Sequence, residues 1–209
     1  GGKIDLSFDY FHNRRSGILC LPNRSIPSYM GAELPYLNIG KTQNTGFEVS
    51  VAYHDRVGKD FEYYVKANMW AAKNKILYMS EDIRADNNGH LYKTGHRINQ
   101  PFYLESLGYY TQEDIDNQDV AKPTWKDVVP GDLKYKDWNG DGIIDNNDSA
   151  PFGYTNVPEM TIGLNLGFSY KNLDVSAFLH AALNRSVYLD ASYYKAFQNN
   201  GSVSEFALN

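Results

Sequence analysis

The sequence predicts an all-β protein, a segment of an antiparallel transmembrane β-barrel with long extracellular loops. Five stretches alternate apolar with polar side chains, which is the period of a strand with two different faces. Each stretch has roughly ten residues, the length of a tilted strand that crosses a bilayer. The connections between them are alternately long and short, as expected of a barrel with turns in the periplasm and loops outside.

The first two expected strands span about 3–13 and 44–55. Each has one apolar face, and the alternate positions are polar or small. The apolar positions are Ile4, Leu6, Phe8 and Tyr10 in the first strand, and Phe47, Val49, Val51 and Tyr53 in the second. This alternation predicts that one side of each strand avoids water while the other side meets it.

Three further strands are expected at about 61–72, 160–170 and 173–183. The short polar link DRVGKD joins the second strand to the third, and Lys171-Asn172 joins the fourth to the fifth, so each pair predicts a hairpin. The aromatic residues near these turns on the apolar face are Tyr53, Phe61 and Tyr170. That is where a barrel carries its interfacial aromatic girdle.

Composition and charge exclude several classes of protein. The 209 residues fit one domain, and the net charge of −5 is not that of a nucleic-acid-binding protein. No apolar run reaches the length of about 18 residues that a transmembrane helix needs. The chain opens on a strand pattern rather than a signal peptide. Because barrels of this kind need at least about eight strands, we expect the chain to be a piece of a larger protein.

The long connection at about 73–159 contains DWNGDGIIDNND at 137–148, a loop of the EF-hand type. Such a loop binds calcium through oxygens at positions 1, 3, 5, 7, 9 and 12. The predicted ligands are Asp137, Asn139, Asp141, the Ile143 carbonyl, Asp145 and Asp148, with Gly142 at the sharp turn. Position 12 is Asp rather than Glu, and no flanking helices are expected. The alternative is a turn stabilised by side chain–backbone hydrogen bonds.

We expect the calcium ion to be structural, since no base, nucleophile or histidine cluster accompanies the loop. Its expected role is to pin a long loop that has no core of its own. The stretch 111–118 predicts a short helix with Thr111 as N-cap. The five histidines show no metal-binding spacing, and Cys20 has no partner motif. No catalytic residue and no bound organic cofactor are predicted, so we expect no enzymatic activity.

Aromatic residues in the loops are candidates for contact with a ligand, although packing between loops is the simpler expectation. They are Tyr29, Tyr36, Phe102, Tyr103, Tyr109, Tyr110, Trp125 and Trp138.

Three segments resemble the SusC/RagA-type TonB-dependent outer-membrane transporters. LNIGKTQNTGFEVSV (37–51) is similar to an N-x-G-x-x-x-N-x-G-x-E segment of that family. PGDLKYKDWNGDGIIDNNDSAPFG (130–153) is similar to a second family segment, and 158–183 to the hairpin that follows it. The resemblance implies part of the C-terminal half of a single-chain barrel of about 22 strands.

The resemblance also implies a function. The parent protein would import glycans or oligopeptides across the outer membrane of a Gram-negative, Bacteroidota-type bacterium, together with a SusD-like surface lipoprotein. Coupling to the TonB complex would use parts of the parent chain that are not present here. The alternative prediction, from a different class, is a soluble secreted calcium-stabilised β-sheet domain for binding or adhesion.

Overall fold

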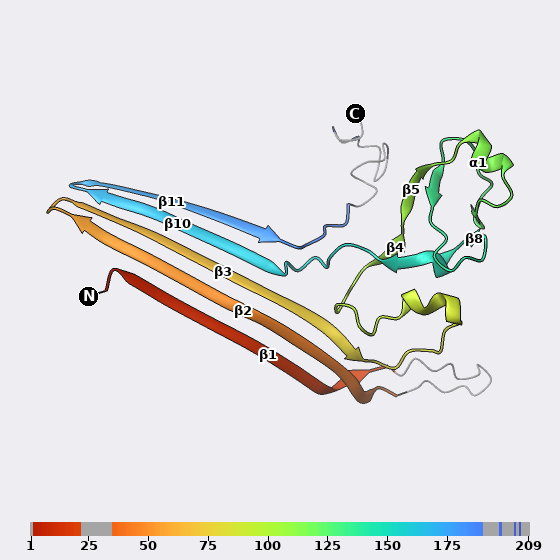
Figure 1. The fold of residues 1–209 in the computed structure, drawn as a ribbon, viewed down its shortest axis with the longest axis horizontal. Coiled ribbons are helices and arrows are strands. Elements are labelled where there is room, and N and C mark those ends of the chain that lie inside the picture. Colours follow the sequence, from red (N-terminus) through yellow and green to blue (C-terminus); the bar gives the residue numbers. More distant parts are fainter. Residues whose placement is uncertain (1, 22–34, 190–196, 198–202, 204, 206–209) are drawn as a thin grey trace.

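The computed structural model describes residues 2–21 and 35–189, together with residues 197, 203 and 205. Its main element is a five-stranded antiparallel sheet with the strand order β1-β2-β3-β10-β11. Figure 1 shows a long, narrow sheet with a separate group of small elements beyond one of its ends. The strands are β1 (Ile4–Cys20), β2 (Leu37–Val57), β3 (Phe61–Tyr78), β10 (Met160–Tyr170) and β11 (Leu173–Leu183).

The two C-terminal strands have the expected bounds, whereas the first three extend further. β1 continues to Cys20, β2 starts at Leu37 and β3 ends at Tyr78. In these extensions neither face is consistently apolar, so the period of two is hard to recognise in the sequence. The ladder between β1 and β2 nevertheless continues, with a bulge between Arg15 and Ile18 where Gly17 adopts φ +70°.

The register of the sheet brings the apolar positions of all five strands onto one face. Val49 of β2 lies opposite Phe8 on one side and Met69 on the other, and Met69 in turn pairs with Ile162. We call this side the apolar face. The described residues leave its side chains without protein cover: Leu6, for example, is 70% exposed and Phe8 is 63% exposed. A contiguous apolar surface of this kind marks contact with a membrane or a protein partner.

The opposite side, which we call the polar face, carries small and polar side chains. Glycine is required on the polar face where side chains of neighbouring residues lie directly above the backbone. A Cβ on Gly46 would stand 2.5 Å from the Phe11 ring and 2.8 Å from the Ala72 side chain, and one on Gly167 would stand 2.5 Å from the Tyr64 ring. Gly46 of β2 and Gly167 of β10 therefore leave room for aromatic residues of the neighbouring strands.

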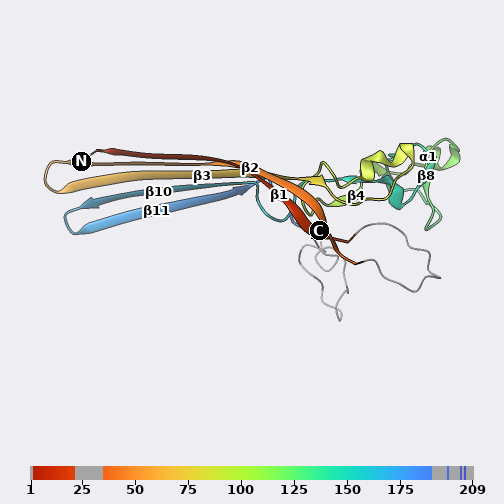
Figure 2. The ribbon, with the colours of Figure 1, turned by 90° about the horizontal axis from the view of Figure 1, so that it is seen from below.

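The two short turns lie at the same end of the sheet (Figure 2). Tyr53, Phe61 and Tyr170, which the sequence places near these turns, join one aromatic cluster there. The Phe61 ring centroid lies 5.8 Å from that of Tyr63, 5.9 Å from that of Phe168 and 6.5 Å from that of Tyr170. Tyr53 extends the cluster, 5.9 Å from Tyr63. These aromatic side chains end the apolar face on the turn side.

Residues 79–159 form a small unit beyond the other end of the sheet, built from short elements (Figures 1 and 2). The expectation that this connection lacks a core is wrong, because Tyr110, Ile144 and Ala150 are buried within it. The elements are a 3-10 helix (Asp86–Leu91), β4 (Phe102–Leu104), β5 (Ser106–Tyr109), α1 (Gln112–Asp116), β6 (Lys122–Pro123), β7 (Leu133–Tyr135), β8 (Ile143–Ile144), a second 3-10 helix (Asn146–Asp148) and β9 (Ser149–Pro151).

Three two-stranded ladders hold this unit together: β4 with β9, β5 with β7, and β6 with β8. The predicted helix is confirmed as α1, with Thr111 as its N-cap in a capping box with Asp114. Lys134 Nζ lies 2.6 Å from the Asp114 carboxylate. This contact and the N–H of Thr111 lower the pKa of that carboxyl to about 2. Among the described residues, no helix has the length and apolar character needed to cross a bilayer.

Candidate functional site

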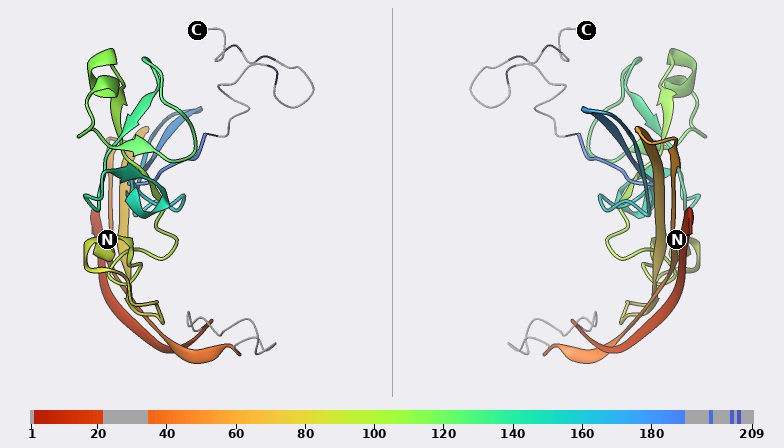
Figure 3. Two further views of the ribbon diagram at one scale, coloured as in Figure 1. Left: turned by 90° about the vertical axis from the view of Figure 1, so that its right-hand side faces the viewer. Right: turned by 90° about the vertical axis from the view of Figure 1, so that its left-hand side faces the viewer.

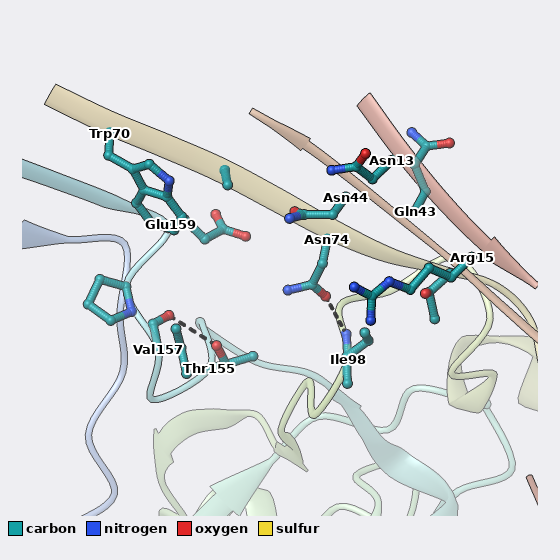
Figure 4. Close-up of a pocket in the computed structure, with 13 residues that line it drawn as sticks. Asn13, Arg15, Gln43, Asn44, Trp70, Asn74, Ile98, Thr155, Val157 and Glu159 are labelled. Carbon is teal, nitrogen blue, oxygen red and sulfur yellow. Dashed lines mark hydrogen bonds between the residues drawn. The ribbon is translucent and has the colours of Figure 1, made fainter. Parts of the chain in front are cut away.

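A recess of about 410 Å³ opens on the polar face, where the sheet meets the base of the long loop. Figure 4 shows side chains from β1, β2 and β3 approaching the loop residues Ile98, Thr155 and Val157. The recess is therefore built from both parts of the molecule. Its lining residues are Asn13, Arg15, Thr42, Gln43, Asn44, Trp70, Ala72, Asn74, Ile98, Thr155, Val157, Pro158 and Glu159.

Three asparagines form a row across the recess. Asn13 of β1 is the register partner of Asn44, which in turn pairs with Asn74 of β3. Neighbouring strands lie about 4.8 Å apart, so the row spans about 10 Å. One of its amides is anchored, because the Asn74 side-chain oxygen accepts a hydrogen bond from the Ile98 N–H at 2.7 Å. Each amide offers both donors and an acceptor, so the row can bind a hydroxyl-rich or amide-rich ligand.

Arg15 and Trp70 add two other kinds of contact to the recess. Within the described chain, no carboxylate forms an ion pair with Arg15, so its guanidinium can meet an anionic group of a ligand. The indole of Trp70 offers an apolar surface on the side of the recess where Glu159 lies (Figure 4). The recess thus combines polar recognition with one aromatic surface, as ligand sites commonly do.

An ion pair between Arg97 and Glu159 closes the base of the long loop. Arg97 donates from Nε to one carboxylate oxygen, and from Nη2 to the other at 3.2 Å. The side chains are 19% and 13% exposed, and the guanidinium lies 4.7 Å from the ring centroid of Tyr154. The hydrogen bond to Glu159 raises the pKa of Arg97 above its ordinary value. Two-point contact of this kind fixes the relative position of both segments.

Backbone hydrogen bonds join the same region to β3. The Ala72 N–H donates to the Glu159 carbonyl at 2.9 Å, just before β10 begins. On the incoming side of the loop, Ile76 exchanges hydrogen bonds with the segment at Gly95 and His96, both at 2.8 Å. The start and the end of the loop are thus both attached to one strand.

At the start of the long loop, Glu81 is hydrogen-bonded to the segment at Lys93 and Thr94. Its carboxylate accepts hydrogen bonds from the backbone N–H groups of Lys93 and Thr94, and from the Thr94 hydroxyl. Partial burial raises the pKa of Glu81, but these hydrogen bonds outweigh burial, and the pKa lies below its ordinary value. The ionised carboxylate of Glu81 therefore stabilises the start of the long loop.

The 137–148 loop adopts a compact turn with its acidic side chains folded onto its own backbone. The two oxygens of Asp137 accept from the Gly140 and Gly142 N–H groups at 2.6 and 2.8 Å. Asn139 accepts from the Asp141 N–H at 3.0 Å, and Asp141 from the Ile143 N–H at 2.9 Å. Gly142, with φ +80°, makes the sharp turn that the pattern requires.

Asp148, the predicted ligand at position 12, is fully buried. Its carboxylate accepts from the Trp138 N–H at 2.9 Å and from the Asp145 N–H at 2.8 Å, so it ties the two ends of the loop together. Asp145 caps the following 3-10 helix and accepts from the Asn147 N–H at 2.6 Å. The hydrogen-bonded turn, the alternative to calcium, is thus present in the structure.

The residue types fit calcium, since all the predicted ligands supply oxygen and a carboxylate oxygen has a second lone pair beside the one that accepts an N–H. The arrangement fits less closely: among the residues that the structure describes, no three acidic, histidine or cysteine side chains gather as a metal site. Calcium binding therefore stays a prediction.

Several candidate loop aromatics pack between loops. Trp138 stacks on His90 with the ring centroids 5.7 Å apart, and the Lys136 Nζ lies 3.9 Å from the Trp138 ring centroid. Tyr103 lies against Phe152 with the ring centroids 6.5 Å apart. Tyr110 is buried, and its hydroxyl donates to the Ala121 carbonyl at 2.6 Å. The candidates that are more than half exposed are Tyr36, Tyr109 and Trp125. Phe102 lies in β4, against His96, and Tyr29 lies outside the described residues.

The asparagine row and the Arg97–Glu159 pair are absent from the sequence-based predictions. The row could have been found by extending the third predicted strand beyond about residue 72, because Asn13 and Asn44 already lie at the ends of the first two predicted strands and Asn74 falls on a polar-face position. The ion pair joins residues 62 positions apart, and no local pattern indicates it.

No protein-family model matches the chain. Among curated proteins, it is 26% identical to TonB-dependent receptor P26 of Formosa agariphila over 99% of this chain and 21% of the receptor. It is 27% identical to TonB-dependent receptor SusC of Bacteroides thetaiotaomicron over 99% of this chain and 20% of SusC. The chain thus spans about a fifth of the length of these relatives.

The fold is similar to solved structures of transporters. A structure of the RagAB peptide transporter is similar over 92% of this chain and 20% of the transporter chain, with a TM-score of 0.61 and 17% sequence identity. The RagAB peptide importer in its open-open state is similar over 95% of this chain and 20% of the importer chain, with a TM-score of 0.63 and 18% sequence identity. The predicted resemblance to SusC/RagA-type TonB-dependent transporters and the predicted barrel-segment fold are confirmed.

The Arg97–Glu159 pair yields a prediction about the long loop. In the full-length protein, Glu159→Gln should increase hydrogen exchange at the amides of Ala72, Ile76 and the 95–98 segment. Removing one partner of a charged hydrogen bond costs about 1.5–3 kcal/mol, which corresponds to roughly tenfold or faster local opening. Glu113→Gln, at an exposed position of α1 in the same loop, is the control. Equal exchange in both variants would show that the ion pair does not hold the base of the loop.

Proposed function

We propose that this chain is part of the barrel of an outer-membrane TonB-dependent nutrient importer, which takes up glycans or oligopeptides and has no enzymatic role. The observation that carries the proposal is the exposed apolar face, which runs in register across all five strands. Lipid is the environment that such a face requires. The similarity to TonB-dependent receptors supports the same conclusion.

The height of the apolar face matches a membrane. β10 carries it from Met160 to Tyr170, a strand of 11 residues. Ten steps of about 3.4 Å extend about 34 Å, or about 26 Å in height at a tilt of about 40°. Barrels of the outer membrane have an apolar band about 25 Å tall. The band therefore fits the bilayer without distortion.

The edges of the sheet fit the same proposal. Within the described residues, β1 pairs only with β2, and β11 pairs only with β10. Strand edges in lipid must be paired, because no water is available to satisfy their N–H and C=O groups. Further strands of the parent protein would pair with β1 and β11. A soluble secreted β-sheet domain is disfavoured, since its apolar face would have to be covered by protein.

The proposed location is the cell outer membrane of a Gram-negative, Bacteroidota-type bacterium. The turns then lie in the periplasm and the 79–159 unit lies outside the cell. A SusD-like surface lipoprotein is the proposed partner on the outside, and the TonB complex is the partner inside, through parts of the parent chain beyond this segment. The recess on the polar face would meet cargo as it enters the barrel, with Asn13, Asn44 and Asn74 as hydrogen-bonding groups.

The proposal has a direct test in cell fractions. The full-length protein should sediment with outer membranes and require detergent for extraction. A strain lacking it should lose growth on at least one complex glycan or oligopeptide mixture supplied as the nutrient source. A variant with Asn13→Leu and Asn44→Leu should reach the membrane in normal amount yet restore that growth poorly. A full-length protein that is soluble and monomeric without detergent would overturn the proposal.

We further propose that the 137–148 loop binds a structural calcium ion through Asp137, Asn139, Asp141, the Ile143 carbonyl, Asp145 and Asp148. The spacing and oxygen chemistry of these residues support it, as does the left-handed Gly142. The ion would neutralise four closely spaced carboxylates, which otherwise repel one another. Its expected effect is to rigidify the loop unit.

Protease resistance tests this site. In the full-length protein, EDTA should speed cleavage within 137–148 by removing the ion, and Asp141→Ala should speed it roughly tenfold, since the lost hydrogen bond to the Ile143 N–H alone costs about 1–3 kcal/mol. Adding calcium back should protect the wild-type loop but not the variant. Asp127→Ala, in the same unit but outside the loop, is the control. Protection of the wild-type loop that neither EDTA nor added calcium changes would mean that the loop is only a hydrogen-bonded turn.

A further inference from the structure

The apolar face changes its chemistry abruptly at the end opposite the turns. Its last apolar row consists of Tyr10, Phe47, Ala71 and Met160, which are register partners. The strands continue on the same side with two polar rows. The first row is His12, Thr45 and Lys73, and the second is Arg14, Gln43 and Lys75.

Three cations in these rows, Arg14, Lys73 and Lys75, are all exposed. We call them the basic rim. They lie on the lipid-facing side of the sheet, whereas the adjacent residues Asn13 and Asn74 line the recess on the other side. The Arg14 Nε donates to the Gln43 side chain at 3.1 Å, which holds the guanidinium on the outer side. The position of these cations therefore follows from the strand register.

The rim has no counter-charge from the described part of the chain. None of the six positions in the two rows is acidic, and no carboxylate of the described residues pairs with a rim cation. At the turn end, Lys3 pairs with Asp55 at 2.7 Å and Arg56 pairs with Glu62. Three clustered cations without a carboxylate partner can bind an external anion.

The depth of the rim identifies the kind of anion. Each polar row lies two residues beyond the row before it, which is about 7 Å along the strand. At a strand tilt of about 40°, this corresponds to about 5 Å along the membrane normal. The headgroup layer outside the hydrocarbon is about 5–7 Å thick on each side. Lys73 thus stands within the headgroup layer, and the long side chains of Arg14 and Lys75 can reach back to it.

We propose that the basic rim binds the phosphate groups of lipids in the outer leaflet of the membrane. The phosphates would supply the missing counter-charge at the depth where the apolar face ends. The inference rests on the proposed outer-membrane placement of the sheet. Lipid binding at the basic rim would fix the height and tilt of the barrel wall beside the long-loop unit.

Native mass spectrometry of the full-length protein, released from detergent, tests this inference. The probes are diphosphorylated lipid A and the same glycolipid without phosphates. A variant with Arg14→Gln, Lys73→Gln and Lys75→Gln should bind the phosphorylated lipid at least about tenfold more weakly, since each cation near an anionic surface contributes roughly fivefold. The phosphate-free lipid should bind equally to both proteins. Lys75→Gln alone, at the row furthest from the apolar face, should retain the fold and still weaken binding.

The matched control is a triple variant that removes three positive charges elsewhere. It carries Lys66→Gln on the polar face, and Lys93→Gln and Lys126→Gln in the loop unit. It should bind like the wild type. Equal binding of both lipids, or unchanged affinity in the rim variants, would overturn the inference. Displacement of the lipid by excess inorganic phosphate would assign the rim to free phosphate instead. A wild-type protein that needs no detergent would contradict the proposed function itself, whereas a detergent-dependent protein with unchanged rim variants contradicts only this inference.

Discussion

The backbone ladder of the five-stranded sheet is the constraint on which the rest of the structure depends. In hydrocarbon every backbone N–H and C=O must be paired within the protein, so the strands cannot slip or fray without a large cost. A slip of one residue would move every apolar side chain to the other face. The register that aligns Phe8, Val49 and Met69 therefore sets which side meets lipid, and by the same alternation it aligns Asn13, Asn44 and Asn74 on the polar side.

In the proposed placement, the same strands connect the membrane to the outside. β1, β2 and β3 continue past the last apolar row, and their extensions carry both the basic rim and the recess. The 79–159 unit is attached through backbone bonds at Ala72 and Ile76, the Ile98–Asn74 hydrogen bond, the Arg97–Glu159 pair, and hydrogen bonds to Ser186 and Asn184 after β11. These contacts lie around the recess, so the same residues that attach the unit also shape the recess.

The sequence predicts the strands well where one face is continuously apolar, as in 160–170 and 173–183. It fails where lipid no longer imposes the pattern, so the ends of β1 and β3 and the start of β2 were missed. The ladders of the loop unit, such as β6 (Lys122–Pro123) with β8 (Ile143–Ile144), are too short to show any period. The core around Tyr110 and the ion pair at Glu159 depend on contacts between distant residues, which no local pattern contains. Calcium binding at 137–148 stays a prediction, because its spacing is equally compatible with the turn that is present.

The central claim is that the alternation of the strands separates lipid from a polar interior. Nitroxide labels placed singly along residues 4–10 of the full-length protein in liposomes test it most directly. Accessibility to oxygen, which concentrates in lipid, should peak at Ile4, Leu6 and Phe8. Accessibility to a water-soluble paramagnetic reagent should peak at Asp5, Ser7 and Asp9. Strong water accessibility at both sets of positions, or none of this alternation, would contradict the account.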